Sequence, residues 1–66
     1  MNRFFIKHKL TVNDITHLSD SDSEFVINKL NLKEENFIEV ETYEAIYFAV
    51  ISDISNKSVE IEILEL

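Results

Sequence analysis

The stretch of sequence that decides the fold is residues 46–63, IYFAVISDISNKSVEIEI. Its first part, residues 46–51, is apolar at every position, which is typical of a strand in the middle of a sheet. Ser55-Asn56 has the composition of a turn, and residues 58–63 then alternate between apolar and polar side chains, as a half-buried strand does. The stretch therefore predicts a β-hairpin.

Three more strands are expected before the hairpin. Residues 37–43 alternate between apolar and acidic side chains, which predicts a half-buried strand. Residues 3–7 contain aromatic and β-branched side chains and predict an edge or barrel-closing strand. Residues 14–18 predict a second short strand, with a turn at Asn13-Asp14 before it.

A single short helix is expected between the second and third strands. Ser21 and Glu24 have the spacing of a capping box, and the carboxylates of Asp22 and Glu24 suit the positive end of a helix dipole. The helix is predicted from about Asp22 to Leu30, with Asn31 as a left-handed stop. Together these elements predict a mainly β (α+β) domain, a small closed β-barrel plugged by one short helix.

Length and composition restrict the class of protein. A chain of 66 residues forms one domain, and because it buries only about 60% of its unfolded surface, we expect a stability of a few kcal/mol. The absence of cysteine excludes disulfides and thiolate metal sites. Residues 1–10 lack the apolar segment of a signal peptide, and the longest apolar run, residues 45–51, is too short to cross a bilayer. We therefore expect a cytoplasmic, soluble protein that has no membrane partner.

Charge is distributed unevenly along the chain. Arg3, Lys7 and Lys9 lie in the first ten residues without an acid, whereas the rest of the chain holds three lysines and all 13 carboxylates, for a net charge of −7. A polyanion is therefore attracted to the first segment and repelled by the remainder. Phe4 and Phe5 point to opposite faces of the predicted strand, so only one of them is available to stack on a base.

The order and spacing of several segments resemble a known family. These segments are Arg3-Phe4-Phe5-Ile6, the Leu18-Ser19 step before the helix, residues 26–30, Phe37-Ile38-Glu39-Val40, Tyr47-Phe48-Ala49-Val50-Ile51 and residues 56–63. Over essentially all 66 residues, the chain resembles the N-terminal, PUA-like domain of the ribosomal RNA small-subunit methyltransferase E family. These enzymes methylate N3 of a uridine in small-subunit ribosomal RNA. The resemblance implies a PUA-like or OB-like β-barrel that positions RNA.

The resemblance also assigns the chemistry to a part of the protein outside this sequence. In such enzymes a C-terminal knotted α/β domain binds S-adenosylmethionine, carries out catalysis and forms the dimer. Residues 1–66 are then the N-terminal fragment of a longer methyltransferase and have no catalytic, cofactor-binding or metal-binding residue of their own. The implied partner is small-subunit ribosomal RNA rather than DNA, and the residues expected to hold its phosphates are Arg3, Lys7, Lys9 and Lys29. The alternative role of the first three charges is to keep a terminal edge strand soluble and unpaired.

The chain departs from the family pattern at positions that matter for RNA. Family members carry a helix pattern like His-x-x-Arg-Val-Leu-Arg, where this chain has Phe25, Asn28 and Asn31. The Gly-Asp turn that follows the helix is Glu35-Asn36 here. Three potential RNA contacts are thus replaced, and Lys29 is a displaced substitute on the helix.

Two functions from different classes remain open. One is an RNA-positioning domain, and the other is an acidic β-barrel that has lost RNA binding and acts as a protein-interaction module. No group of residues in the sequence supports a stand-alone enzyme, because neither histidine has a carboxylate at a recognised metal-ligand spacing. The paired acids alternate with Ile and Val as a solvated strand face does; they are Glu39, Glu41, Glu60 and Glu62.

Overall fold

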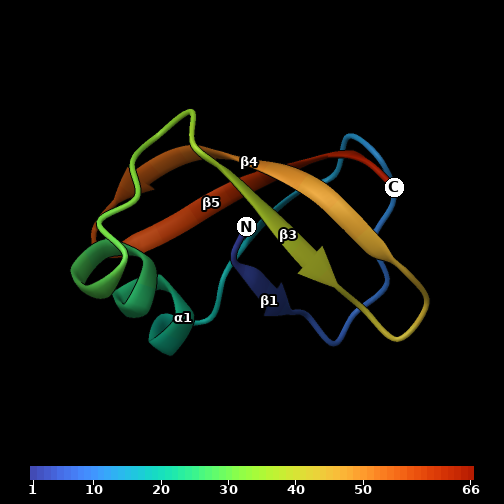
Figure 1. The fold of residues 1–66 in the computed structure, drawn as a ribbon, viewed down its shortest axis with the longest axis horizontal. Helices are drawn as coiled ribbons and strands as arrows, with labels where there is room; N and C mark the ends of the chain where they lie inside the picture. Colours follow the sequence, from blue (N-terminus) through green and yellow to red (C-terminus); the bar gives the residue numbers. More distant parts are fainter.

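The structure is a computed structural model that describes all residues from 1 to 66. Figure 1 shows a curved sheet with a helical segment at one end. The strands are β1 (Arg3–Phe5), β2 (Ile15–His17), β3 (Phe37–Glu41), β4 (Ile46–Ser55) and β5 (Ser58–Glu65), and the helical segment is α1 (Asp20–Glu24) continued by η1 (Phe25–Lys29). The predicted mainly β (α+β) class with one short helix is confirmed. Neither helical element is long and apolar enough to span a membrane.

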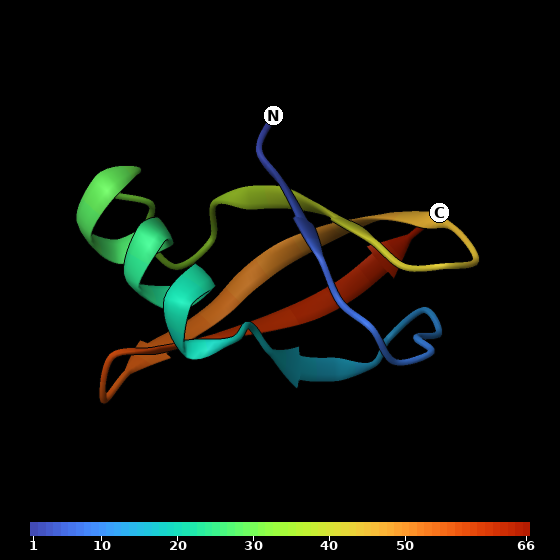
Figure 2. The ribbon, with the colours of Figure 1, turned by 90° about the horizontal axis from the view of Figure 1, so that it is seen from below.

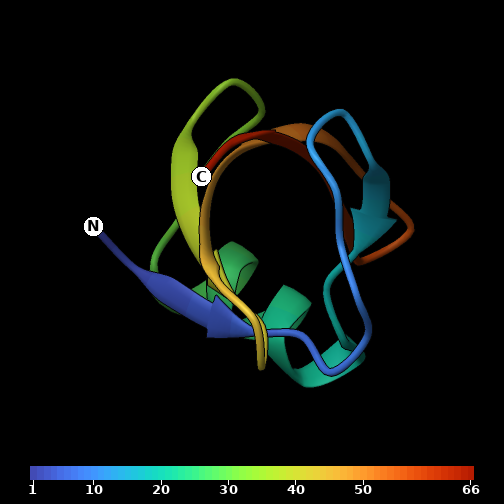
Figure 3. The same cartoon turned by 90° about the vertical axis from the view of Figure 1, so that its right-hand side faces the viewer.

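The sheet is curled but open, so the prediction of a closed barrel is wrong. The strand order is β1-β3-β4-β5-β2, which leaves β1 and β2 as edges. β1 runs parallel to β3, whereas the other pairs are antiparallel. Residues 6–14 cross the open side between the two edges (Figure 3), and this segment contributes the buried side chains of Ile6 and Leu10. Side-chain packing therefore fills the gap that strand pairing would have closed.

The predicted hairpin is confirmed, and its turn lies one residue later than expected. β4 and β5 pair antiparallel as far as Ser55 and Ser58. Asn56 and Lys57 form the turn with φ values of 52° and 63°. A two-residue turn with both φ values positive matches the right-handed twist of the strands it joins. The turn therefore requires the left-handed region at Asn56 and Lys57, although neither residue is a glycine.

The hairpin strand β4 lies at the centre of the sheet, as its apolar composition predicted. Only its inner face is fully buried, with Tyr47, Ala49 and Ile51 packed in the core. The alternate residues Phe48 and Val50 are half-buried, because the helical segment lies at the end of the sheet near the β4–β5 turn and leaves the outer face uncovered (Figure 2). The outer face of β4 is therefore an apolar surface without a covering layer.

The core is formed by the inner faces of the strands together with the helix and the first connecting segment. Tyr47 links two of these parts, because its hydroxyl donates a 2.9 Å hydrogen bond to the buried Leu10 carbonyl. The 13 core residues are Phe4, Ile6, Leu10, Leu18, Val26, Ile38, Val40, Tyr47, Ala49, Ile51, Val59, Ile61 and Ile63. The alternation read from residues 37–43 and 58–63 thus selects the buried face of β3 and β5 correctly.

The helix begins earlier than predicted, and Ser19 is its N-cap in place of Ser21. The Ser19 hydroxyl accepts a 3.1 Å hydrogen bond from the Asp22 amide. The Ser-Asp repeat offers two starts with equal spacing, and the earlier start directs Ser23 into the core. There the Ser23 hydroxyl accepts a 3.1 Å hydrogen bond from the Val59 amide of β5. This contact with the sheet explains why the earlier start is favoured.

The second half of the helical segment is wider than an α-helix. The Leu30 amide donates to the Phe25 carbonyl (3.0 Å), five residues back, which is the hydrogen-bond spacing of a π-helix. Asn31 then has a φ of 53°, so the predicted left-handed stop is confirmed. The Leu32 amide donates a hydrogen bond to the Val26 carbonyl (3.1 Å), which satisfies one of the last free carbonyls of the helix.

Removing the cap is expected to destabilise the protein measurably. We expect Ser19→Ala to lower the free energy of unfolding by about 1 kcal/mol, because the Asp22 amide loses its acceptor. Urea denaturation followed by circular dichroism measures the change. Ser21→Ala is the matched control, since Ser21 is exposed on the same helix. A larger loss for Ser21→Ala would show that the cap is at Ser21.

The turn before β3 carries backbone strain at a residue other than glycine or asparagine. Glu35 has a φ of 76°, a region that a side chain with a Cβ enters only at a cost. The position is held from both sides, because the Glu35 amide donates to the Ile51 carbonyl (2.8 Å) and the Asn36 side chain accepts from the Lys33 amide (2.9 Å). The backbone at Glu35 is therefore one that glycine would adopt more easily.

Candidate nucleic-acid interface

Arg3, the first of the predicted RNA contacts, is already engaged by acids. The parallel register of β1 and β3 places Arg3 opposite Glu39. Its Nε lies 3.1 Å from Glu39 Oε1, and its Nη1 lies 3.7 Å from Glu41 Oε1. An exposed ion pair of this kind contributes at most about 1 kcal/mol, yet the two carboxylates offset the charge of Arg3. Arg3 is therefore a poor phosphate contact in this arrangement.

Lys7 and Lys9 lie together on the segment that leaves β1. The Ile6 amide donates to the Glu41 carbonyl (2.9 Å), and Ile6 and Leu10 are buried, so the segment is anchored on both sides of the lysines. Both lysines line a small hollow of about 120 Å³ at the β3–β4 turn. Neither ammonium group lies within ion-pair distance of a carboxylate. Their positive charges are therefore available to an anion.

The β3–β4 turn presents an aromatic side chain beside the lysines. The Thr42 hydroxyl accepts hydrogen bonds from the amides of Glu44 (3.1 Å) and Ala45 (3.2 Å), and this arrangement fixes the turn. Tyr43 at its tip is 78% exposed. The Tyr43 ring meets Phe5 of β1 edge to face, with centroids 5.0 Å apart and an interplanar angle of 80°. Tyr43 lines the same hollow as the lysines, and Phe5, which is itself 46% exposed, extends the aromatic surface from Tyr43 onto β1.

The fourth predicted contact, Lys29, lies apart from the other three. It is exposed near the end of η1 and lines a different hollow, with Ser21, Glu24, Phe25 and Asn28. The four predicted residues thus divide into a paired Arg3, a Lys7 and Lys9 pair, and a separate Lys29. We call the group Phe5, Lys7, Lys9 and Tyr43 the lysine–aromatic site.

The sequence predicts one exposed ring in the first strand, which is Phe5, but it does not predict its partner Tyr43. Phe4 is buried and Phe5 is exposed, as expected for neighbours on opposite faces of a strand. Tyr43 falls within the strand predicted over residues 37–43, but β3 ends at Glu41. The signal that could have located it is Thr42 itself, because a threonine hydroxyl that accepts hydrogen bonds from amides two and three positions later is typical of a turn.

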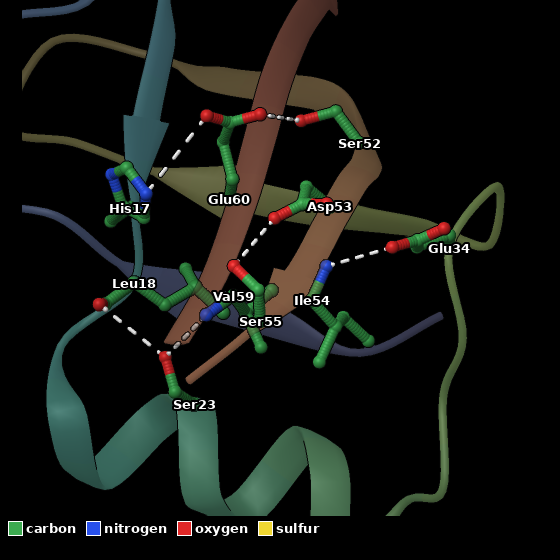
Figure 4. Close-up of polar contacts among 10 residues, drawn as sticks. All are labelled: His17, Leu18, Ser23, Glu34, Ser52, Asp53, Ile54, Ser55, Val59 and Glu60. Carbon is green, nitrogen blue, oxygen red and sulfur yellow. Dashed lines mark hydrogen bonds and ion pairs between the residues drawn. The ribbon is translucent and has the colours of Figure 1, made fainter. Parts of the chain in front are cut away.

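A second polar cluster, shown in Figure 4, connects β2, β4 and β5. His17 Nε2 lies 3.9 Å from Glu60 Oε2, and the Ser52 hydroxyl donates to Glu60 Oε1 at 2.9 Å. The carboxylate therefore lies between the serine and the imidazole, so the imidazole does not contact the hydroxyl as it does in a Ser-His-Asp triad. No three His, Cys, Asp or Glu side chains gather to hold a metal ion. The cluster has the geometry of a structural link across the sheet.

Comparison with known proteins relates the fold to methyltransferases. No protein-family model and no curated protein matches the chain. Among solved structures, a methyltransferase of Legionella pneumophila in complex with the cofactor SAM aligns with a TM-score of 0.87 and 16% identity, over 96% of this chain and 26% of that chain. The chain therefore shares the fold of one segment of that methyltransferase. Ribosomal RNA small subunit methyltransferase E from Neisseria gonorrhoeae, bound to S-adenosyl methionine, aligns with a TM-score of 0.84 and 23% identity, over 98% of this chain and 27% of that chain. The chain thus spans about a quarter of each of these methyltransferases.

Proposed function

We propose that this chain is the RNA-positioning domain of a small-subunit ribosomal RNA uridine-N3 methyltransferase and that it is not catalytic by itself. The observation that carries the proposal is the lysine–aromatic site, where two unpaired lysines line a hollow with Tyr43, whose exposed ring contacts the exposed ring of Phe5. The shared fold with a ribosomal RNA methyltransferase supports it. In this proposal the methyl transfer, S-adenosylmethionine binding and dimer contact belong to the rest of a longer, cytoplasmic protein.

The lysine–aromatic site has the two kinds of group that hold a single-stranded nucleotide. Lys7 and Lys9 suit phosphate oxygens, and such contacts fix the register of a nucleic acid without reading its sequence. Phe5 and Tyr43 offer faces on which an unpaired base can stack. Glu44 lines the same hollow, so it would repel a phosphate on its side and favour the approach over the lysines.

The strained turn at Glu35 adds support from a different part of the chain. The family that the sequence resembles carries Gly-Asp where this chain has Glu35-Asn36. Glu35 retains the left-handed backbone, with a φ of 76°, that a glycine would adopt without strain. A glycine would suit the backbone at this position, so the turn geometry agrees with the Gly-Asp of that family and supports the resemblance.

Replacing both lysines is expected to weaken RNA binding and its salt dependence. For Lys7→Ala/Lys9→Ala, we expect the slope of log affinity against log salt concentration to become shallower by about 1.5, which corresponds to two lost phosphate contacts. A structured fragment of small-subunit ribosomal RNA, titrated over a range of salt concentrations, supplies the measurement.

A charge-matched variant separates a specific site from a general loss of positive charge. Lys33→Ala/Lys57→Ala removes the same charge from exposed positions outside the lysine–aromatic site. We expect this control to keep the wild-type slope. Equal slopes for the two double variants would contradict the proposal, and an absence of RNA binding by the wild-type chain at low salt would favour a protein-interaction module.

A further inference from the structure

The outer face of the sheet exposes a connected apolar surface. Register places Phe37 of β3 beside Val50 of β4, and Phe37 also stacks on Phe48 with ring centroids 4.9 Å apart and an interplanar angle of 24°. Ile46 lies on the same face further along β4. Ile46 is 41% exposed and Phe37 is 49% exposed. We call Phe37, Ile46, Phe48 and Val50 the outer apolar stripe. A connected surface of this kind on a small domain is typical of a contact site.

One end of the outer apolar stripe is hollowed. A cavity of about 360 Å³ lies beside Ile46 and Phe48, and its other lining residues are Glu39, Tyr47, Glu65 and Leu66. Leu66 is largely exposed there. The hollow can receive an apolar side chain from outside, because most of its lining side chains are apolar.

Carboxylates flank the stripe on both sides. Glu39 and Glu41 lie on the outer face of β3, and Glu62 lies opposite Val50 on β5. Arg3 of the neighbouring strand β1 is paired with Glu39 and Glu41. The face is thus an apolar centre with acidic flanks. RNA would be repelled by these flanks, and a second copy of the chain would bring the same carboxylates together.

We propose that this outer face docks a protein segment with an apolar centre flanked by Lys or Arg. Such a segment would cover the stripe with its apolar side chains and place its cations beside the carboxylates of β3 and β5. This role goes beyond RNA positioning and uses a different surface. It also gives a function to the excess of carboxylates in the chain. The negative charge that repels RNA attracts a basic protein segment.

Peptide titration tests the docking surface. The probe is a synthetic amphipathic helix of Leu and Lys, titrated into the whole ¹⁵N-labelled chain, and a Leu and Glu twin of equal length is the charge control. We expect amide shifts concentrated at the outer apolar stripe and at Glu62, with little change at Lys7 and Lys9. Equal binding of the Glu twin, or shifts centred on another face, would overturn the proposal.

Two variants separate the apolar contact from general attraction between opposite charges. We expect Phe37→Thr/Phe48→Thr to weaken binding of the Lys peptide about tenfold or more, because it removes the stacked pair but keeps strand-forming residues. Tyr43→Thr removes a more exposed ring of the lysine–aromatic site, and it should bind the peptide like the wild type. Equal weakening by both variants would contradict docking at the stripe.

A charge variant and the oligomeric state complete the test. Glu39→Gln/Glu62→Gln should keep the fold and weaken binding most at low salt, where exposed charges are least screened. Self-association of the free chain, measured by light scattering and lost in Phe37→Thr/Phe48→Thr, would show that a second copy occupies the face and would overturn the proposal of a basic partner. These measurements leave the RNA proposal untouched, because that proposal depends on Lys7 and Lys9.

Discussion

Ile51→Ala is expected to leave much of the protein unfolded in water at room temperature. Ile51 is fully buried on the inner face of β4 and lies opposite Ile61, which is also fully buried. Truncating a buried isoleucine to alanine costs about 2–5 kcal/mol. That loss is comparable to the whole stability of a domain this small. The Ile51 carbonyl also accepts a hydrogen bond from the Glu35 amide, and the Ile51 amide donates one to the Asn36 carbonyl. A shift of β4 at Ile51 should therefore weaken the turn before β3 as well.

A second isoleucine provides the matched control. Ile15 in the edge strand β2 is 62% exposed, and Ile15→Ala deletes the same atoms at the surface. We expect it to change the free energy of unfolding by less than about 0.5 kcal/mol. Urea unfolding followed by far-ultraviolet circular dichroism compares the two variants. Similar midpoints for Ile51→Ala and Ile15→Ala would show that the core is not where the structure places it.

The second large effect is expected from Ser23→Ala, a change of one hydroxyl group. The Ser23 hydroxyl accepts from the Val59 amide (3.1 Å) and makes a longer contact, 3.5 Å, to the Leu18 carbonyl (Figure 4). All three residues are buried. Removing the hydroxyl leaves a buried amide without a partner, at a cost of about 1–3 kcal/mol. The melting temperature should fall by roughly 10 °C, given about 4–8 °C for each kcal/mol in a domain of this size.

Hydrogen exchange distinguishes this loss from general destabilisation. The Val59 amide should lose more protection in Ser23→Ala than its neighbours in β5 do, because its own acceptor is removed. Ser21→Ala, an exposed change two positions earlier, should leave the protection of Val59 unchanged. A Val59 amide that stays equally protected in both variants would contradict a role for Ser23 in joining the helix to the sheet.

The strands were predictable because their pattern is local. In β3 and β5 every second residue is apolar, and the period of two identifies both the element and its buried face. The helix start was ambiguous, because Ser19 and Ser21 each precede an acidic residue by three positions. Only the contact between Ser23 and β5 decides between them, and that contact joins residues far apart in the sequence.

The open sheet and the candidate site depend on such distant contacts more strongly. Charge segregation identified Lys7 and Lys9 directly. The pairing of Phe5 with Tyr43, and of Arg3 with Glu39, follows from the parallel register of β1 and β3. A period of two carries no information about which strand lies beside which. For the same reason, it could not show that the two edge strands fail to meet.

The strand order also has a consequence for the chain during its synthesis. β1 and β2 leave the ribosome first, but β1 pairs only with β3 and β2 pairs only with β5. At roughly 5–20 residues per second, they wait for seconds before their partners appear. A native-like sheet with both edges in place can form only after the last strand has emerged. We therefore expect nascent chains that stop before β5 to remain sensitive to protease, and resistance to arise in one step when β5 is released.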